Sequence, residues 1–253
     1  MRTRSTVLVS ALILAAHGAL ADDAPRITRI DPPKRMLFLG NSFTYFNAGV
    51  PHHVRELAAS ADPAHNDAYY YAMATLSGAT LRQLDSMMPI IKSEKFDIVV
   101  LQGQSLEPIA SKEDSEKFRA AVRAFDRAIR DSGAKTVLYM TWAFGSKPDI
   151  ATPLARAYVA AGNEVGALVV PVGLAFEASR RDHPAIDLYY VDQKHPSLAG
   201  TYLAACVFYA ALYGRSPEGN EYLGGLSAGA AHDLQRTAWD TVTKFYGSPP
   251  GGR

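Results

Sequence analysis

The segment 35–44 reads Arg35-Met-Leu-Phe-Leu-Gly-Asn-Ser-Phe-Thr44, an apolar run of strand length that breaks into Gly40-Asn41-Ser42. Far downstream the chain contains Asp192-Gln-Lys-His195-Pro196. A serine hydroxyl needs a neighbouring imidazole to take its proton, and the imidazole needs a carboxylate to hold its tautomer. The two segments together therefore predict an exposed nucleophilic serine with a base and an orienting carboxylate.

Four further apolar runs of strand length follow the first, with segments of helical spacing between them. The predicted strands cover 36–39, 69–73, 97–102, 136–142 and 167–172, and the predicted helices cover 51–60, 80–93, 112–132 and 153–165. This alternation predicts an α/β fold whose parallel sheet of about five strands is buried on both faces. In such sheets ligands bind beyond the carboxyl ends of the strands.

The segments at the ends of the predicted strands are mostly small or polar. They are Gly40-Asn41-Ser42, Ser77-Gly78, Gly103-Gln104-Ser105 and Trp142-Ala-Phe-Gly145. Asp192 and His195 come just before a long apolar helix. We expect all of these to gather at one edge of the sheet. A developing oxyanion needs hydrogen-bond donors, for which the candidates are the N–H groups of Ser42 and Gly78 and a side chain near Gln104.

In four blocks the chain resembles the SGNH (GDSL-like) hydrolases, a family of small flavodoxin-like α/β esterases. These blocks are 40–42, Gly78, 103–105 and 192–196. The blocks occur in the same order over 36–212. The resemblance implies a three-layer sandwich, with Ser42 as nucleophile, His195 as general base and acid, and Asp192 as its orienting carboxylate. It also implies an oxyanion hole formed by the N–H groups of Ser42 and Gly78 and by an amide side chain.

The chain departs from the family pattern at two positions. Asn41 stands where Asp is commonest, at a position outside the triad. The third block lacks the family's Asn: strict register puts Ser105 there, while Gln104 supplies a carboxamide. We favour Gln104 as the oxyanion donor because its side chain carries the same functional group as Asn.

Each candidate also has an ordinary structural interpretation. Ser42 could cap a helix, Gly78 could relax a loop, and Trp142 fits a core position better than a pocket wall. Asp182-His183-Pro184 is a rival pair, but only Asp192 has the three-residue offset that brings its carboxylate to the imidazole. Cys206 lies in an apolar run, which predicts a buried residue without chemistry.

Composition limits the class of function. Removing Arg2 and Arg4 from the 26 basic residues leaves 24 against 25 acidic ones, a near-balance that predicts neither a nucleic-acid partner nor an anionic membrane surface. A single cysteine excludes an internal disulfide and a thiolate metal cluster. We predict no metal, because His52 and His53 diverge by about 100° on a helix, and we predict no cofactor.

The domain organisation predicted from sequence begins with a signal peptide at 1–21, built from Arg2, Arg4, an apolar stretch at 7–16 and a small-residue site at 19–21. A lead-in at 22–34, one hydrolase-like domain at 35–247 and a disordered tail at 248–253 follow. The protein is then secreted or periplasmic, without a membrane span.

The predicted activity is hydrolysis of carboxylic esters through an acyl-enzyme, on a small-molecule or carbohydrate ester, with deacetylation of carbohydrate as the first choice. Two alternatives stay open. One is an O-acetyltransferase that passes the acyl group to a glycan, and the other is a glycan-binding relative without catalysis. The sequence carries no signal for the oligomeric state.

Overall fold

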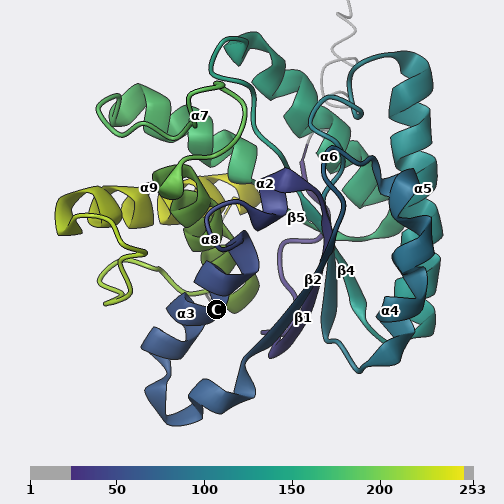
Figure 1. The fold of residues 1–253 in the computed structure, drawn as a ribbon, viewed down its shortest axis with the longest axis horizontal. Coiled ribbons are helices and arrows are strands. Elements are labelled where there is room, and N and C mark those ends of the chain that lie inside the picture. Colours follow the sequence, from purple (N-terminus) through teal and green to yellow (C-terminus); the bar gives the residue numbers. More distant parts are fainter. Residues whose placement is uncertain (1–23, 248–253) are drawn as a thin grey trace, which may run out of the picture.

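In the computed structural model, which describes residues 24–247, five parallel strands form one sheet in the order β2-β1-β3-β4-β5. The strands are β1 (Arg35–Gly40), β2 (Tyr70–Thr75), β3 (Ile98–Leu101), β4 (Lys135–Tyr139) and β5 (Leu168–Val170). Figure 1 shows helices on both sides of this sheet. The predicted three-layer α/β fold with about five parallel strands is confirmed.

One helical layer contains α3 (Val50–Ala61), α7 (Val172–Asp182), α8 (Leu198–Tyr213) and α9 (Ala228–Tyr246), which pack against one buried cluster. The other contains α4 (Met88–Ser93), α5 (Lys112–Asp131) and α6 (Ala151–Val165). Shorter elements are α2 (Ser42–Tyr45) and the 3-10 helices η1 (Pro63–Ala68), η2 (Leu81–Met87) and η3 (Pro148–Ile150). The two layers stand on opposite sides of the strands in Figure 1.

The first strand shows why the sheet is apolar on both faces. Met36 and Phe38 enter the cluster beside α3 and α8, while Leu37 and Leu39 enter the cluster beside α5. Successive side chains of a strand point to opposite faces, so a run of apolar residues buries both. All four side chains are fully buried.

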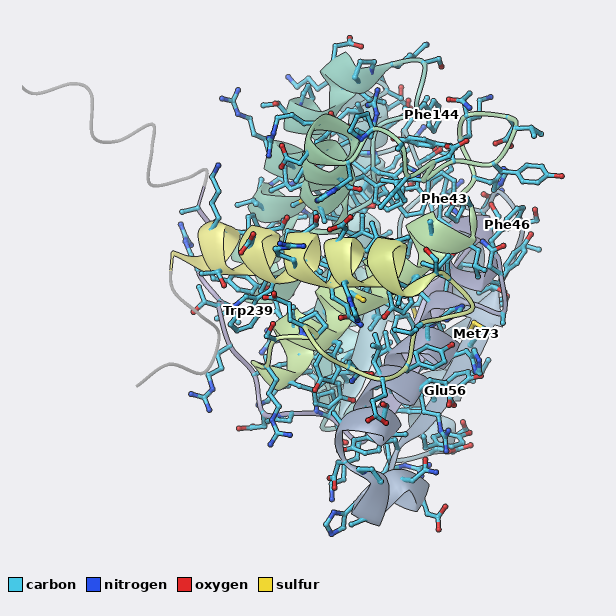
Figure 2. All side chains as sticks on the ribbon, turned by 90° about the vertical axis from the view of Figure 1, so that its left-hand side faces the viewer. Phe43, Phe46, Glu56, Met73, Phe144 and Trp239 are labelled. Atoms are coloured by element: carbon cyan, nitrogen blue, oxygen red, sulfur yellow. The ribbon has the colours of Figure 1, made fainter. Side chains whose placement is uncertain are left out.

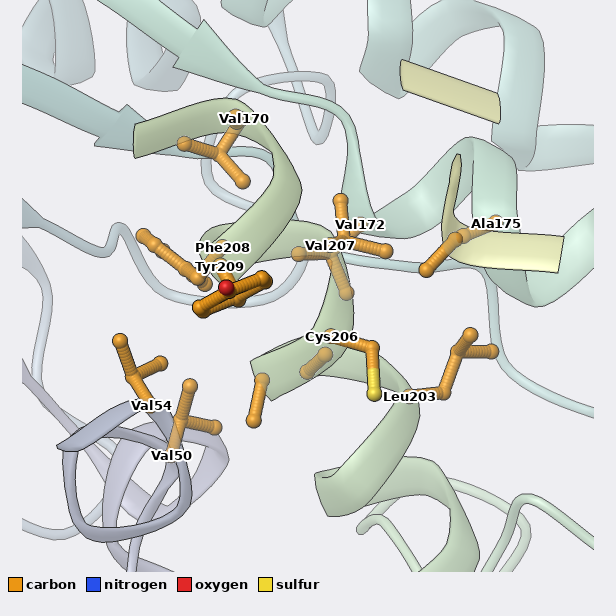
Figure 3. Close-up of a cluster of buried hydrophobic side chains, with 14 of the residues drawn as sticks. Val50, Val54, Val170, Val172, Ala175, Leu203, Cys206, Val207, Phe208 and Tyr209 are labelled. Atoms are coloured by element: carbon orange, nitrogen blue, oxygen red, sulfur yellow. The ribbon is translucent and has the colours of Figure 1, made fainter. Parts of the chain in front are cut away.

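The helix α8 is apolar all round and buries 14 of its 16 residues. Figure 3 shows its residues Cys206, Val207 and Phe208 in one cluster with Val50 and Val54 of α3. Burial raises the pKa of the Cys206 thiol well above its ordinary value, so this side chain is an inert part of the core, as predicted.

The long helix predicted at 112–132 is confirmed as α5. Ser111 caps it by accepting a hydrogen bond from Asp114 N at 3.0 Å. Its apolar stripe is buried against the sheet, and its members are Phe118, Val122, Phe125 and Ile129. Gly133, with φ +85°, follows the end of the helix.

Some predicted elements differ from the structure. The helix expected at 80–93 divides into η2 and α4, because Pro89 at the start of α4 lacks an N–H and cannot continue the preceding helix. The strand expected at 136–142 ends at Tyr139. The strand expected at 167–172 ends at Val170, and α7, which was not predicted, begins two residues later because the apolar run crosses directly from strand to helix.

Residues 24–34 form neither helix nor strand, and they attach to α6 through Asn163. Arg26 N donates to Asn163 Oδ1 at 2.8 Å, and Asn163 Nδ2 donates to Ala24 O at 2.9 Å. The predicted signal peptide at 1–21 and the predicted tail at 248–253 lie outside the described residues. Among residues 24–247 no helix combines the length and apolarity that crossing a membrane requires.

Candidate active site

The carboxyl ends of β1, β2 and β3 lie level with one another, which brings the polar segments that follow them to one edge. Gly40 pairs with Thr75, and Leu39 pairs with Leu101. The registry continues past the strands, because Leu76 N donates to Gly40 O at 3.1 Å. The blocks that begin at Gly40, Ser77 and Gly103 therefore meet at this edge, as the sequence predicted.

Ser42, His195 and Asp192 form one hydrogen-bonded chain at this edge. Ser42 Oγ lies 2.9 Å from His195 Nε2, and His195 Nδ1 lies 2.5 Å from Asp192 Oδ2. The first contact joins residues 153 positions apart in the sequence. Ser42 was predicted to be exposed, but it is only 6% exposed, because it lies at the start of α2 beneath its partners. The side chains of His195 and Asp192 are 29% and 38% exposed.

The surroundings of Asp192 fix which groups carry protons. Its Oδ1 accepts hydrogen bonds from the N–H groups of Lys194 and His195, each at 3.0 Å. Burial acts to raise the pKa of Asp192, but the hydrogen bonds from the His195 ring and from these two N–H groups outweigh it and lower the pKa to about 2. An ionised carboxylate only accepts, so Nδ1 of His195 carries the proton and Nε2 is free to accept one from Ser42.

The segment 193–196 around His195 is held through its backbone. Each of its four carbonyl groups accepts a hydrogen bond from a different donor. In order along the segment these donors are Gly145 N at 2.9 Å, Trp142 Nε1 at 3.0 Å, Tyr190 N at 2.8 Å and Asn47 Nδ2 at 3.0 Å. The imidazole therefore belongs to a segment whose backbone is held by four separate hydrogen-bond donors.

Aromatic rings confine the imidazole itself. Phe46 stacks on the His195 ring with centroids 4.4 Å apart and an interplanar angle of 11°, and Phe43 meets it edge-on at 5.7 Å. Figure 2 shows Phe43 and Phe46 at the same end of the molecule. Both rings come from the short segment that follows the proposed nucleophile.

Gln102 is a buried residue that hydrogen-bonds the start of α2, and it was not predicted from the sequence. Its Oε1 accepts from Asn41 N at 2.8 Å and from Thr44 Oγ1 at 3.0 Å, and its Nε2 donates to Gly103 O. A Cβ at Gly40 would lie only 2.6 Å from this Oε1, so the glycine allows the close approach. The sequence shows only a glutamine directly after the apolar run 98–101, and the structure shows that this glutamine is fully buried.

Asn41 organises the first turn of α2. Its Oδ1 accepts from Phe43 N at 3.2 Å, and its Nδ2 donates to Ala79 O at 3.0 Å, which ties the segment after β1 to the segment after β2. Asn41, and not Ser42, is thus the helix cap. Asn41 N and Phe43 N have acceptors, whereas Ser42 N between them donates to no acceptor among the described residues.

Gly78 lies in the segment that Asn41 holds. Its φ of +67° favours glycine, and a Cβ there would meet nothing within 4 Å. Within residues 24–247 its N–H donates to no acceptor. The backbone conformation, and not lack of space, therefore explains why this position is glycine.

Gln104 and Ser105 are joined to each other. Gln104 Oε1 accepts from Leu106 N at 2.9 Å and Glu107 N at 3.0 Å, and its Nε2 donates to Ser105 Oγ at 3.1 Å. The amide oxygen of Gln104 therefore accepts from two backbone N–H groups of a turn. Its NH₂ group makes one hydrogen bond, to Ser105, and has a second N–H that this bond does not use. Gln104 also lines a polar pocket of about 350 Å³ together with Thr80 and Gln83, from the segment after Gly78.

The rival pair Asp182 and His183 has other partners. His183 of the rival pair lies 3.5 Å from Asp233 of α9, and Asp182 pairs with Arg181. Trp142 is fully buried, which confirms the core position predicted for it.

His53 lies near the start of α3, where a surface or cap-adjacent histidine is the ordinary expectation, but it is buried. It is 4% exposed, its Nε2 donates to Asn47 O at 2.8 Å, and its Nδ1 accepts from Tyr222 Oη at 2.7 Å. Burial lowers its pKa, which keeps the ring neutral in this arrangement. In the part of the chain that the structure describes, no three His, Cys, Asp or Glu side chains are grouped so as to hold a metal ion.

Proteins with a similar fold are known from solved structures, although the sequence comparisons found none. No family model matches the sequence, and no curated protein matches it. Solved structures do match. A protein from Slackia heliotrinireducens assigned to the SGNH hydrolases is 27% identical, with a TM-score of 0.60 over 70% of this chain and 98% of that chain.

Two further structures are similar in fold. A DUF4886 family protein from Bacteroides uniformis is 18% identical, with a TM-score of 0.61 over 85% of this chain and 96% of that one. The acetyl xylan esterase AlAXEase is 17% identical, with a TM-score of 0.58 over 70% and 99%. The chain therefore has the fold of the SGNH hydrolases, the family that its sequence blocks resemble.

Proposed function

We propose that the protein is a serine hydrolase that cleaves carboxylic esters through an acyl-enzyme intermediate. The observation that carries this proposal is the hydrogen-bonded chain from Ser42 Oγ through the His195 ring to Asp192. Its order matches the requirement for a nucleophile, a base and a group that holds the tautomer of the base. A fold shared with the SGNH hydrolases supports the same conclusion.

Acylation follows from the proton positions. Ser42 Oγ attacks the ester carbonyl while its proton passes to His195 Nε2, and the imidazolium that forms is stabilised by the Asp192 carboxylate. Collapse of the tetrahedral intermediate breaks the ester C–O bond, and Nε2 returns the proton to the leaving alcohol. Water then attacks the acyl-enzyme by the same proton transfers and releases the acid together with free Ser42.

The intermediate oxygen carries a negative charge that donors must stabilise. We assign the N–H groups of Ser42 and Gly78 to this role, because neither is used within the described residues. Gln104 is our third donor, since its Nε2 makes one hydrogen bond, to Ser105 Oγ, and so keeps a second N–H for an oxyanion. Donors of this kind, fixed before the reaction, typically contribute about 3 kcal/mol each to lowering the barrier.

Within the ester hydrolases, we favour an acetylated carbohydrate as substrate and a secreted or periplasmic location. This choice of substrate is supported by the similarity in fold between this chain and the acetyl xylan esterase. The arginine-led apolar stretch at 1–21 supports the location.

Hydrolysis of p-nitrophenyl acetate by the purified protein tests the activity. We expect turnover that disappears in Ser42→Ala and persists in Ser93→Ala, which removes an exposed serine at the end of α4. Hydrolysis by Ser42→Ala at the unmutated rate would contradict the proposal. With acetylated xylan, free acetate indicates a hydrolase, whereas acetyl groups transferred to an added glycan would indicate the transferase alternative.

A further inference from the structure

Trp142 contacts the two segments that carry the proposed nucleophile and base. Its indole N–H donates to Lys194 O at 3.0 Å, and its ring stacks on Phe43 with centroids 4.3 Å apart and an interplanar angle of 10°. Phe43 directly follows Ser42, and Lys194 directly precedes His195. One rigid, fully buried side chain thus connects the neighbours of both reacting groups.

We propose that Trp142 is a positioning residue, which sets the separation of Ser42 Oγ and His195 Nε2 by holding Phe43 and the Lys194 carbonyl at once. The inference rests on the proposed function, because it assigns a role relative to that pair of atoms. The contact between Ser42 and His195 joins two remote segments, so local chain geometry cannot fix it.

The ring is itself immobilised from its other face. Phe176 of α7 stacks on Trp142 at 4.3 Å with an interplanar angle of 2°, so the indole lies between two parallel rings. Phe43 is also held by a second contact, from Tyr139 Oη to Phe43 O at 3.4 Å. The stack runs from α7 through the indole to the start of α2, and it allows the indole little rotation.

Core packing alone does not account for the polar contact. A phenylalanine could fill most of this space, but it could not donate to Lys194 O. The other three carbonyl groups of 193–196 have their own donors, so loss of the indole N–H would leave only that of Lys194 without one. The segment could then shift, and a misplacement of about 1 Å can reduce a catalysed rate by about 100-fold.

Trp142→Phe in the full-length protein tests the inference. We expect kcat for p-nitrophenyl acetate to fall about tenfold or more, with KM changed less than about twofold, because positioning acts on the chemical step and not on substrate binding. The rate at which a p-nitrophenyl phosphonate ester labels Ser42 should fall in parallel, since labelling needs the same activated hydroxyl.

Two controls separate positioning from general packing. Trp239→Phe makes the same substitution in α9, away from Phe43 (Figure 2), and should leave both rates unchanged. Phe176→Leu removes the outer ring of the stack but keeps the indole N–H, so it should lower the unfolding temperature and slow labelling much less than Trp142→Phe does. Phe43→Leu, which removes the inner ring, should slow labelling and serves as a second test if Trp142→Phe does not fold.

The inference is overturned if Trp142→Phe labels Ser42 at the unmutated rate, or if Phe176→Leu slows labelling as much as Trp142→Phe does. Either result can occur while Ser42→Ala abolishes hydrolysis, which would leave the proposed function intact. Hydrolysis that survives in Ser42→Ala would instead refute the proposed function itself.

Discussion

At the scale of single residues, hydrogen bonding determines where each proton of the site resides. Asp192 accepts three hydrogen bonds and is ionised, so the imidazole proton lies on Nδ1 and the Ser42 hydroxyl faces a free Nε2. The three residues act as a unit, because Ser42 needs His195 to take its proton and His195 needs Asp192 to hold its tautomer.

Asp192→Asn tests the tautomer. The amide can donate to Nδ1, which moves the proton to Nε2 and leaves no base for Ser42, so kcat should fall by ~10⁴-fold. The measurement is steady-state hydrolysis of p-nitrophenyl acetate at pH 7. A decrease of less than about tenfold would show that the carboxylate does not set the tautomer.

The same variant should change the pH dependence of stability. The pKa of Asp192 is lowered from 3.8 to about 2 in the folded protein, so the ionised carboxylate stabilises the fold above pH 3.8, and this contribution is lost as the pH falls towards 2. The unfolding temperatures of the unmutated protein and Asp192→Asn should therefore converge between pH 4 and 2. A constant difference across this range would contradict the assignment.

Gln104→Glu distinguishes Gln104 from Ser105 as the side-chain oxyanion donor. Glutamate keeps an acceptor for the N–H groups of Leu106 and Glu107 but loses the amide donor, so kcat should fall by about 100-fold or more while folding is retained. Ser105→Ala should change kcat by less than about tenfold. The reverse order of effects would assign the role to Ser105.

At the scale of elements, the site depends on how one strand end contacts the next. Gln102 at the end of β3 holds the start of α2, and Asn41 holds the segment after β2. The sequence predicted which segments would meet, because parallel strands place their carboxyl ends at one edge. It did not predict Gln102, because nothing in the local pattern shows that its Oε1 accepts from residues 58 and 61 positions away.

Gln102→Leu tests this bridge. Two buried donors, Asn41 N–H and the Thr44 hydroxyl, would lose their acceptor, at a cost of about 1–3 kcal/mol each in unfolding free energy. We expect a lower urea midpoint together with a lower kcat, because α2 carries Ser42.

Gln235→Leu provides the matched control for Gln102→Leu. Gln235 is also fully buried and hydrogen-bonded, but it contacts Tyr202 and Asn220, on the side of α8 and α9. It should reduce stability without reducing kcat per folded molecule. Equal effects of both variants on kcat would show that Gln102 has no particular role in the site.

At the scale of the whole molecule, the α/β alternation predicted the sheet. The grouping of Ser42, Asp192 and His195 was predicted from the three-residue offset of Asp192 and from the resemblance to the SGNH hydrolases. The hydrophobic pattern did not predict the start of α7, where a strand and a helix join without a long loop. It also did not predict that Pro89 divides the helix expected at 80–93. It also could not show the burial of His53, since its partners Asn47 and Tyr222 come together only through tertiary packing.

The central claim is that the fold brings Ser42 and His195 together to make one serine nucleophilic. Mass spectrometry of the full-length protein after treatment with a p-nitrophenyl phosphonate ester tests it most directly. We predict a single phosphonyl adduct, on the peptide that contains Ser42, which is absent in Ser42→Ala and forms far more slowly in His195→Ala. An adduct on another residue, or labelling of Ser42 that is unaffected by His195→Ala, would contradict the account.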